Sequence, residues 1–228
     1  MMQPIIAKKA RLMAASSKER SPVLFRTSAI VLTAALALTA CQRNPLKVTR
    51  NPCPAVAVPA YTGDVTLFST PGATAADAID TVATITNVRG GCSDDGSEFV
   101  TNVSFDVLAR RNEAGAAESV TLPFFVAVVR GGDKLVAKQL GQVTVNFSEG
   151  QDRAQASGSA QSRVIRSAAI LPADIQEKIT RERRPGDEDA AIDPMTEPGV
   201  RDAVRNASFE VLVGFQLDQA QLAYNATK

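Results

Sequence analysis

The chain has 228 residues, enough for one domain or two, and 45% of them are hydrophobic, as is usual in folded globular proteins. Its 25 basic and 24 acidic residues nearly balance, which argues against a dedicated nucleic-acid binder. It has no histidine, which excludes Ser-His-Asp and Cys-His catalysis and most catalytic zinc sites. The composition therefore favours a protein that is not an enzyme and has no nucleic-acid partner.

Residues 1–40 have the pattern of an export signal. Six basic side chains and a single acidic one lie within residues 1–26, and an uncharged apolar run of 13 residues follows from Ser28 to Ala40. A helix of that length rises only ~20 Å, too short for a hydrocarbon core of ~30 Å, so the run predicts a cleaved signal peptide. Met13 is an alternative start, because it leaves a shorter basic segment before the apolar run.

The apolar run ends in Leu38, Thr39, Ala40 and Cys41. This tetrapeptide, after a basic and then apolar segment, resembles the lipobox of bacterial lipoproteins. The resemblance implies that residues 1–40 are removed and that Cys41 carries a covalent lipid, with no other cofactor expected. The alternatives are an ordinary cleaved signal with an unrelated cysteine, or an uncleaved anchor.

Gln42 follows the lipidated position where an aspartate would favour retention in the inner membrane, so the resemblance implies the outer membrane, with the domain facing the periplasm. The sorting rule varies between bacterial lineages. Without residues 1–40 the chain keeps 19 basic and 23 acidic residues, a net charge of −4. We therefore expect acyl chains, rather than surface charge, to attach the protein to the membrane.

Two further cysteines, Cys53 and Cys92, remain for a second role. The compartment beyond the inner membrane is oxidising, so we expect them to form one disulfide that closes a loop of about 39 residues. A redox or metal site is the alternative, although the chain lacks histidine and a Cys-x-x-Cys arrangement.

The chain downstream of the signal divides into two parts. Residues 41–53 contain the lipidated cysteine and a polar, proline-containing tether, whose residues 42–52 reach ~36 Å when fully extended. Residues 54–228 form the domain, and within it residues 185–200, with three prolines and five acids, predict a mobile loop.

Short segments of strand character dominate the domain. Val103, Phe105 and Val107 alternate with polar residues, and residues 118–130 are nearly all apolar, with Pro123 indicating an edge position or a bulge. Seven strands are expected over residues 54–59, 64–69, 83–88, 99–110, 118–130, 135–137 (with strand character continuing over 143–147) and 208–216, and residues 159–170 are a candidate for an eighth. Seven or eight strands predict a mainly β fold: one β-sandwich-like domain, Ig-like or a partly open barrel.

Two short helices are expected beside these strands. Residues 172–184 begin with a proline and an acid and end in basic residues, which suits the helix dipole. A second helix begins at Asp218, where Gln221 completes a capping-box pattern.

Three charged clusters are candidates for chemistry. The acidic loop could bind Ca²⁺, Asp94 and Asp95 could form half of an acid–base or metal site, and the basic run could contact an anionic envelope polymer. A solvated loop, a turn between strands at Gly96 and a charged helix end are the better explanations of the three clusters, because none of them has the residue spacing of a specific site. The acids of the loop are Asp187, Glu188, Asp189 and Asp193, and the basic run is Arg181, Arg183 and Arg184.

These patterns together predict an outer-membrane lipoprotein with a structural or accessory role that binds another envelope protein. Its domain resembles the uncharacterised lipoproteins of proteobacterial envelopes. The alternative is a periplasmic carrier or chaperone for an apolar small ligand or lipid, which would need a cavity between the sheets. A hydrolase that uses two carboxylates is a third class, but no motif brings two acids together.

Overall fold

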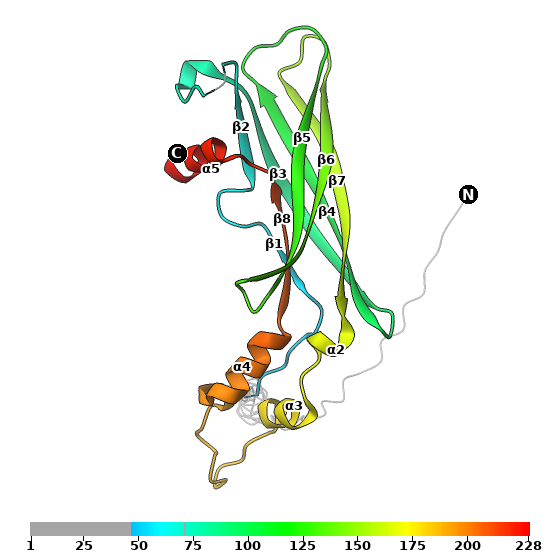
Figure 1. Ribbon diagram of the computed structural model, residues 1–228, viewed down its shortest axis with the longest axis vertical. Helices are drawn as coiled ribbons and strands as arrows, with labels where there is room; N and C mark the ends of the chain where they lie inside the picture. The colour runs from blue at the N-terminus through cyan, green and yellow to red at the C-terminus, as the bar shows by residue number, and fades with distance from the viewer. Residues whose placement is uncertain (1–46, 71) are drawn as a thin grey trace, which may run out of the picture. The chain divides into compact units, whose positions relative to one another are not determined.

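The computed structural model describes residues 47–70 and 72–228, all of which belong to one compact unit, residues 45–228. In these residues, strands with alternating burial form two sheets, and the short helices of residues 166–207 lie at one end of the strands (Figure 1). The strands are β1 (Ala55–Ala57), β2 (Asp64–Phe68), β3 (Ile79–Asp94), β4 (Glu98–Arg111), β5 (Glu118–Arg130), β6 (Lys134–Phe147), β7 (Arg153–Ile165) and β8 (Phe209–Phe215). The helices are α2 (Arg166–Ala169), α3 (Ala173–Thr180), α4 (Pro198–Ala207) and α5 (Gln219–Thr227), with 3-10 turns η2 (Ala76–Ala78) and η3 (Pro194–Thr196).

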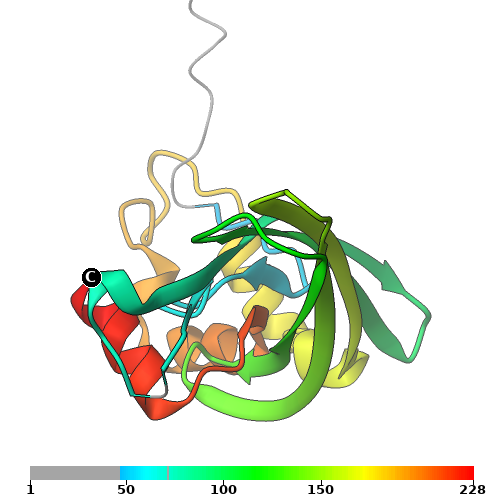
Figure 2. The ribbon, with the colours of Figure 1, turned by 90° about the horizontal axis from the view of Figure 1, so that it is seen from above.

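Each sheet has four strands. One has the order β1-β8-β5-β6, with β1 parallel to β8 and the other pairs antiparallel. The other has the order β2-β3-β4-β7 and is antiparallel throughout. The chain passes from one sheet to the other after β1, β4, β6 and β7, and the sheets curl around a shared interior (Figure 2). The predicted mainly β, sandwich-like fold class is confirmed.

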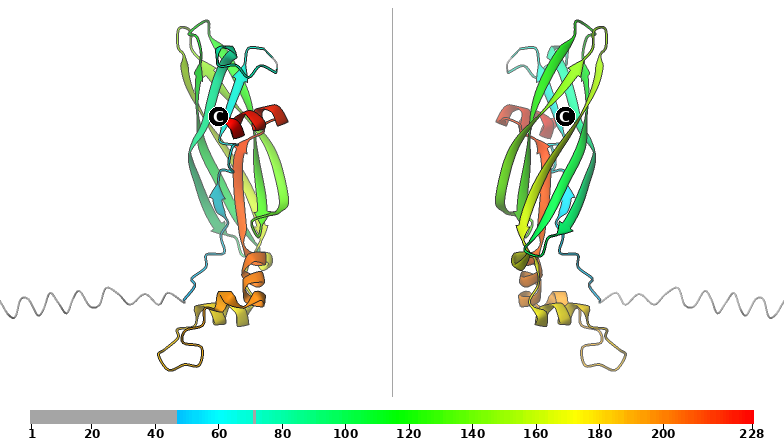
Figure 3. Two further views of the ribbon diagram at one scale, coloured as in Figure 1. Left: turned by 90° about the vertical axis from the view of Figure 1, so that its left-hand side faces the viewer. Right: turned by 90° about the vertical axis from the view of Figure 1, so that its right-hand side faces the viewer.

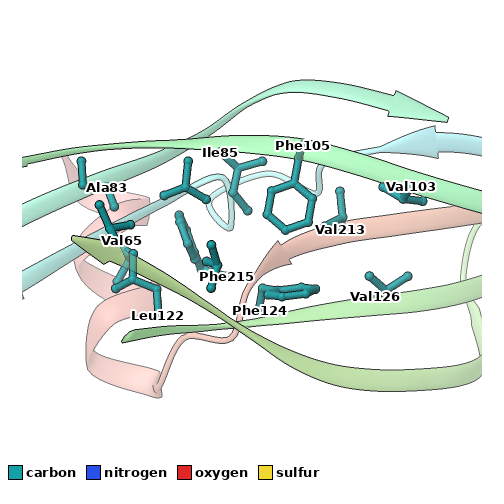
Figure 4. Close-up of a cluster of buried hydrophobic side chains, with 14 of the residues drawn as sticks. Val65, Ala83, Ile85, Val103, Phe105, Leu122, Phe124, Val126, Val213 and Phe215 are labelled. Carbon is teal, nitrogen blue, oxygen red and sulfur yellow. The ribbon is translucent and has the colours of Figure 1, made fainter. Parts of the chain in front are cut away.

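The space between the sheets is filled by side chains. Phe105 of β4 and Phe124 of β5 meet edge to face with ring centroids 5.0 Å apart, and both are buried (Figure 4). Each ring lies under a glycine of an edge strand, Phe105 under Gly158 of β7 and Phe124 under Gly141 of β6. The remaining large side chains of this core include Leu122, Phe147 and Phe215.

The pairing of strand β5 with its neighbours shows how it accommodates Pro123. It pairs with β6 along its whole length, but its ladder with β8 begins only at Phe124, so Pro123 lies where that ladder ends. The Gln216 N–H still donates to the Pro123 carbonyl at 2.9 Å, while the missing N–H of proline costs least at the end of a ladder. Strand β5 is therefore an inner strand, and its irregularity lies at Val128 and Val129, so the predicted edge position or bulge at Pro123 is not found.

The segment between β7 and β8 is more helical than the sequence suggests. The strand predicted over 159–170 ends at Ile165, and α2 follows, with Ala169 fully buried. The region predicted as a loop over 185–200 contains η3 and the beginning of α4, because Pro198 stands in the first turn of a helix, where its missing N–H costs nothing. Val200 of α4 packs with Leu171 and Ile179 in a separate apolar cluster, so this segment has a core of its own.

Both predicted helices are present, the first shorter than expected. Helix α3 covers only the first part of the predicted range 172–184. Helix α5 begins with the predicted capping box of Asp218 and Gln221 and lies beside β2 (Figure 3). The buried Asn225 amide fixes it there by donating to the carbonyls of Tyr61 and Asp64, at 2.8 and 2.7 Å.

Candidate functional site at the end where the chain enters the domain

The lipobox residues Leu38, Thr39, Ala40 and Cys41 lie outside the described residues, so the site is approached from the first described segment, residues 47–53. We call it the docked segment. The Val48 N–H donates to the Ile179 carbonyl of α3 at 2.9 Å. The Arg50 guanidinium donates to the carbonyl of Ala169 at 2.8 Å and to that of Ala207. The last part of the predicted tether is therefore bonded to the helices α2, α3 and α4.

Arg50 is the residue that joins these helices to the incoming chain. Its two acceptors are the last residues of α2 and α4, and carbonyls at helix ends lack partners within the helix. A cation there also suits the negative end of each helix dipole. Partial burial lowers the pKa of Arg50, but the pKa of an arginine lies so far above neutral pH that the side chain keeps its charge.

A disulfide secures the same segment. Cys53 is bonded to Cys92 of β3, with their Cα atoms 6.1 Å apart, and the predicted pairing is confirmed. Cys53 also packs against the apolar cluster of Phe99, Val128, Val164, Ala169 and Phe209. The chain is thus covalently linked to one sheet at the point where it joins the other as β1.

The predicted charged clusters are engaged within the domain. Asp189 of the acidic loop pairs with Arg181 and Arg183, and these contacts lower its pKa. The Arg183 side chain is almost wholly buried, which a basic run alone does not reveal. Asp187 accepts the Arg184 N–H at 3.0 Å, and Asp193 caps η3.

Asp94 and Asp95 form the turn between β3 and β4. Asp94 accepts the Gly96 N–H at 2.9 Å, and Asp95 accepts the N–H groups of Ser97 and Glu98. The Arg166 side chain adds a hydrogen bond and lowers the pKa of Asp94. The turn interpretation holds, and among the described residues no group of three or more His, Cys, Asp or Glu side chains is placed to hold a metal ion.

A groove with basic walls opens at this end of the domain, and the sequence analysis missed it. We call it the hairpin groove: it has a volume of about 440 Å³ and lies between the turn that joins β5 to β6 and the end of β7. Three of its apolar side chains are unusually exposed, Leu135 at 59%, Val136 at 53% and Ile165 at 62%. They look like ordinary strand residues in the sequence, since nothing there shows that β6 has no second neighbour at this point.

The charged side chains that line the hairpin groove are all basic, whereas Arg130 and Lys134 also line a neighbouring pocket that contains Asp133 and Asp202. The lining of the hairpin groove includes Arg130, Lys134 and Arg163 and no carboxylate. Arg130 lies over the ring of Phe209, 5.6 Å from its centroid, and donates to the carbonyl of Asn206. Arg163 pairs with Glu98 at 3.3 Å, outside the groove lining, and Lys134 has no ion-pair partner among the described residues.

A second groove, of about 850 Å³, lies on the outer face of the other sheet near the opposite end of the strands. Its lining mixes Arg110 and Arg153 with Asp80, and Arg110 also faces Asp152 at 3.7 Å. It is larger, but its lining carries charges of both signs, and it lies where β3 begins and β4 ends, away from the Cys92 end of β3 to which the docked segment is bonded.

The fold defines the protein as a β-sandwich-like domain with a helical end into which its N-terminal segment docks. No family model, no curated protein and no solved structure matches the chain. In the described part of the chain, no helix combines the length and apolar character needed to cross a membrane.

Proposed function

We propose that this protein is a bacterial outer-membrane lipoprotein whose covalent lipid on Cys41 attaches a periplasmic domain to the membrane. The observation that carries the proposal is the tetrapeptide Leu38–Cys41 directly after a basic and then apolar segment. Two or three acyl chains attach a protein in effect permanently, since each buried methylene contributes ~0.8 kcal/mol.

The disulfide supports export. Cys53 and Cys92 are bonded, and such a bond persists in an oxidising compartment and is rare in the cytosol. The same bond leaves Cys41 as the one cysteine of the chain with no partner among the other two. Lipid attachment requires a thiol that is not engaged in a disulfide.

For the domain we propose a non-catalytic structural or accessory role, in which it binds another protein of the envelope. The sheets end in edge strands, β6 among them, and edge strands and exposed apolar side chains are common contact surfaces between proteins. The carrier alternative is less well supported, because the interior between the sheets is occupied by Phe105, Phe124 and their neighbours.

The proposal is tested by labelling cells that express the chain with radioactive palmitate and then fractionating their membranes. We expect label and outer-membrane location for the wild type, and loss of both in Cys41→Ser. The double variant Cys53→Ala/Cys92→Ala is the matched control and should keep the label. An unlabelled wild type, or label that survives in Cys41→Ser, would overturn the proposal.

A further inference from the structure

We propose that the hairpin groove contacts the anionic lipid surface of the membrane, with the phosphates of the headgroups at Arg130, Lys134 and Arg163 and acyl chains against Leu135, Val136 and Ile165. This inference rests on the proposed lipid anchor for its orientation but not for its chemistry. It adds a surface of the folded domain to an attachment otherwise made by one cysteine.

The chemistry of the groove matches an anionic amphiphile. Three cations surround exposed apolar side chains, and no carboxylate contributes to the lining. The chain beyond the signal has a net charge of −4, so a purely basic groove runs against the average of its surface. Lys or Arg near an anionic membrane surface each contribute attraction, and aliphatic side chains beside them enter the acyl boundary.

The side chain of Arg130 is fixed in position at the groove by contacts with the protein. Its guanidinium lies over the buried ring of Phe209 and donates to the carbonyl of the exposed Asn206, so contacts with the protein on two sides fix its position. Asp133, the carboxylate nearest in sequence, pairs with Arg205 instead. Asp133 is thereby paired with Arg205 and not with Lys134, which has no ion-pair partner among the described residues.

The length of chain before the docked segment selects this end of the domain. From Cys41 to Val48 there are seven residues, which span at most ~25 Å. Strand β4 has 14 residues and extends ~45 Å, so a lipid on Cys41 cannot bring the opposite end of the strands to the membrane. The groove lies at the near end, where Cys53 packs on Val128, Val164 and Phe209, which also line it.

The experiment uses the full chain and exploits its lack of tryptophan. Leu135→Trp places a reporter in the groove, and Leu108→Trp, at a residue 48% exposed on the other sheet, is the matched control. Each variant is mixed with vesicles of phosphatidylcholine and phosphatidylglycerol whose acyl chains carry bromine, which quenches tryptophan on contact. We expect quenching at position 135 and not at position 108.

Charge variants test the basic residues. In the Leu135→Trp chain, Lys134→Gln should raise the vesicle concentration for half-maximal quenching roughly fivefold, whereas Lys228→Gln, near the other end of the strands, should leave it unchanged. Equal quenching at positions 135 and 108 would overturn the inference. So would a blue shift at position 135 that needs no vesicles and grows with protein concentration, because a second copy of the chain would then cover the groove.

The proposed lipid anchor and the proposed membrane contact of the hairpin groove are tested by independent measurements. Repeating the quenching in a Cys41→Ser chain reports on the groove alone, and palmitate labelling reports on the anchor alone. Quenching without label would sustain the groove and overturn the anchor, and label without quenching would do the reverse.

Discussion

Arg111 shows how a single buried side chain organises the loops at the end of the strands opposite the helices. Its guanidinium donates to the carbonyls of Ala116 and Gln151, both at 2.8 Å, and lies over the ring of Phe147. It also reaches Gly115 and Ser148, so one arginine bonds the loops that follow β4 and β6. Its charge is met by Glu118 at 3.6 Å.

Replacing Arg111 by methionine should lower the free energy of unfolding by ~2–4 kcal/mol, because the carbonyls of two loops lose the donors of one buried guanidinium. Arg111→Lys should recover only part of the lost free energy, since an ammonium group lacks the planar, forked set of N–H donors of a guanidinium. Arg110→Met, at the exposed neighbour, is the control and should change stability by less than ~0.5 kcal/mol. Urea denaturation of the three variants checks this, and equal effects at both positions would refute it.

Asp106 shows how surface carboxylates set the acid stability. The Asn87 amide and the Ser157 hydroxyl both donate to it at 2.8 Å, and they lower its pKa. A carboxyl with a lowered pKa in the folded state stabilises the fold above its unfolded pKa of about 4, and this contribution disappears as the pH falls through the folded value. The chain has no histidine, so no ordinary side chain titrates between about pH 5 and 8.

We therefore expect the free energy of unfolding to be constant from about pH 8 to 5 and to fall below about pH 4. Asp106→Asn should make that fall shallower without creating a new dependence near neutral pH. Denaturation curves at a series of pH values test both points. A fall of the same steepness in the variant would show that Asp106 does not contribute.

At the scale of the elements, two glycines allow the edge strands to approach the core aromatics. A Cβ atom at Gly158 would lie 2.3 Å from Phe105, and one at Gly141 would lie 2.4 Å from Phe124. Since neither distance is tolerated, β6 and β7 can cover these rings only where they carry glycine. At these two points, where an aromatic residue pairs with a glycine on the neighbouring strand, the edge strand closes the interior with its backbone rather than with a side chain.

Gly158→Ala should consequently lower the free energy of unfolding by ~1–3 kcal/mol, because the Phe105 ring must move within a filled core. Gly91→Ala is the matched control on strand β3, where an added Cβ meets nothing within 4 Å and should be neutral or slightly stabilising. Phe105→Leu in the Gly158→Ala chain should restore part of the loss. Thermal or urea unfolding measures all three, and an unaffected Gly158→Ala would contradict this packing.

At the scale of the whole described unit, the docked segment and the strand β1 that follows it contact three separate clusters of buried side chains. Val48 packs among the helices, Cys53 packs below the sheets, and Val56 packs against the core between the sheets. The disulfide and Arg50 hold this path in place. A load applied through the N-terminal segment would therefore reach both sheets and the helical end together.

Removing the disulfide with Cys53→Ala/Cys92→Ala should lower the free energy of unfolding by ~4 kcal/mol in the chain-entropy account, because the unfolded chain regains the freedom of a 39-residue loop. Cys41→Ser is the control, since it leaves the loop closed. Denaturation with and without reductant checks the result: reductant should destabilise the wild type and leave the double variant unchanged. A wild type insensitive to reduction would refute it.

The sequence by itself determined the local features whose cause is local. Alternating side chains define a strand such as β4, and Asp218 and Gln221 define the start of α5. The two cysteines that follow Cys41 in the sequence define a bond. Tertiary structure decided what depends on neighbours far away in the chain. Helix α4 forms where Pro198 and Gly199 suggest a loop, because Val200 packs with Ile179 in one apolar cluster. Arg183 is buried because the chain brings Asp189 into an ion pair with it. The hairpin groove belongs to this second kind: Leu135, Val136 and Ile165 become exposed only because the strands that carry them have no further partner there, and exposure is a property of the assembled sheets rather than of the residues.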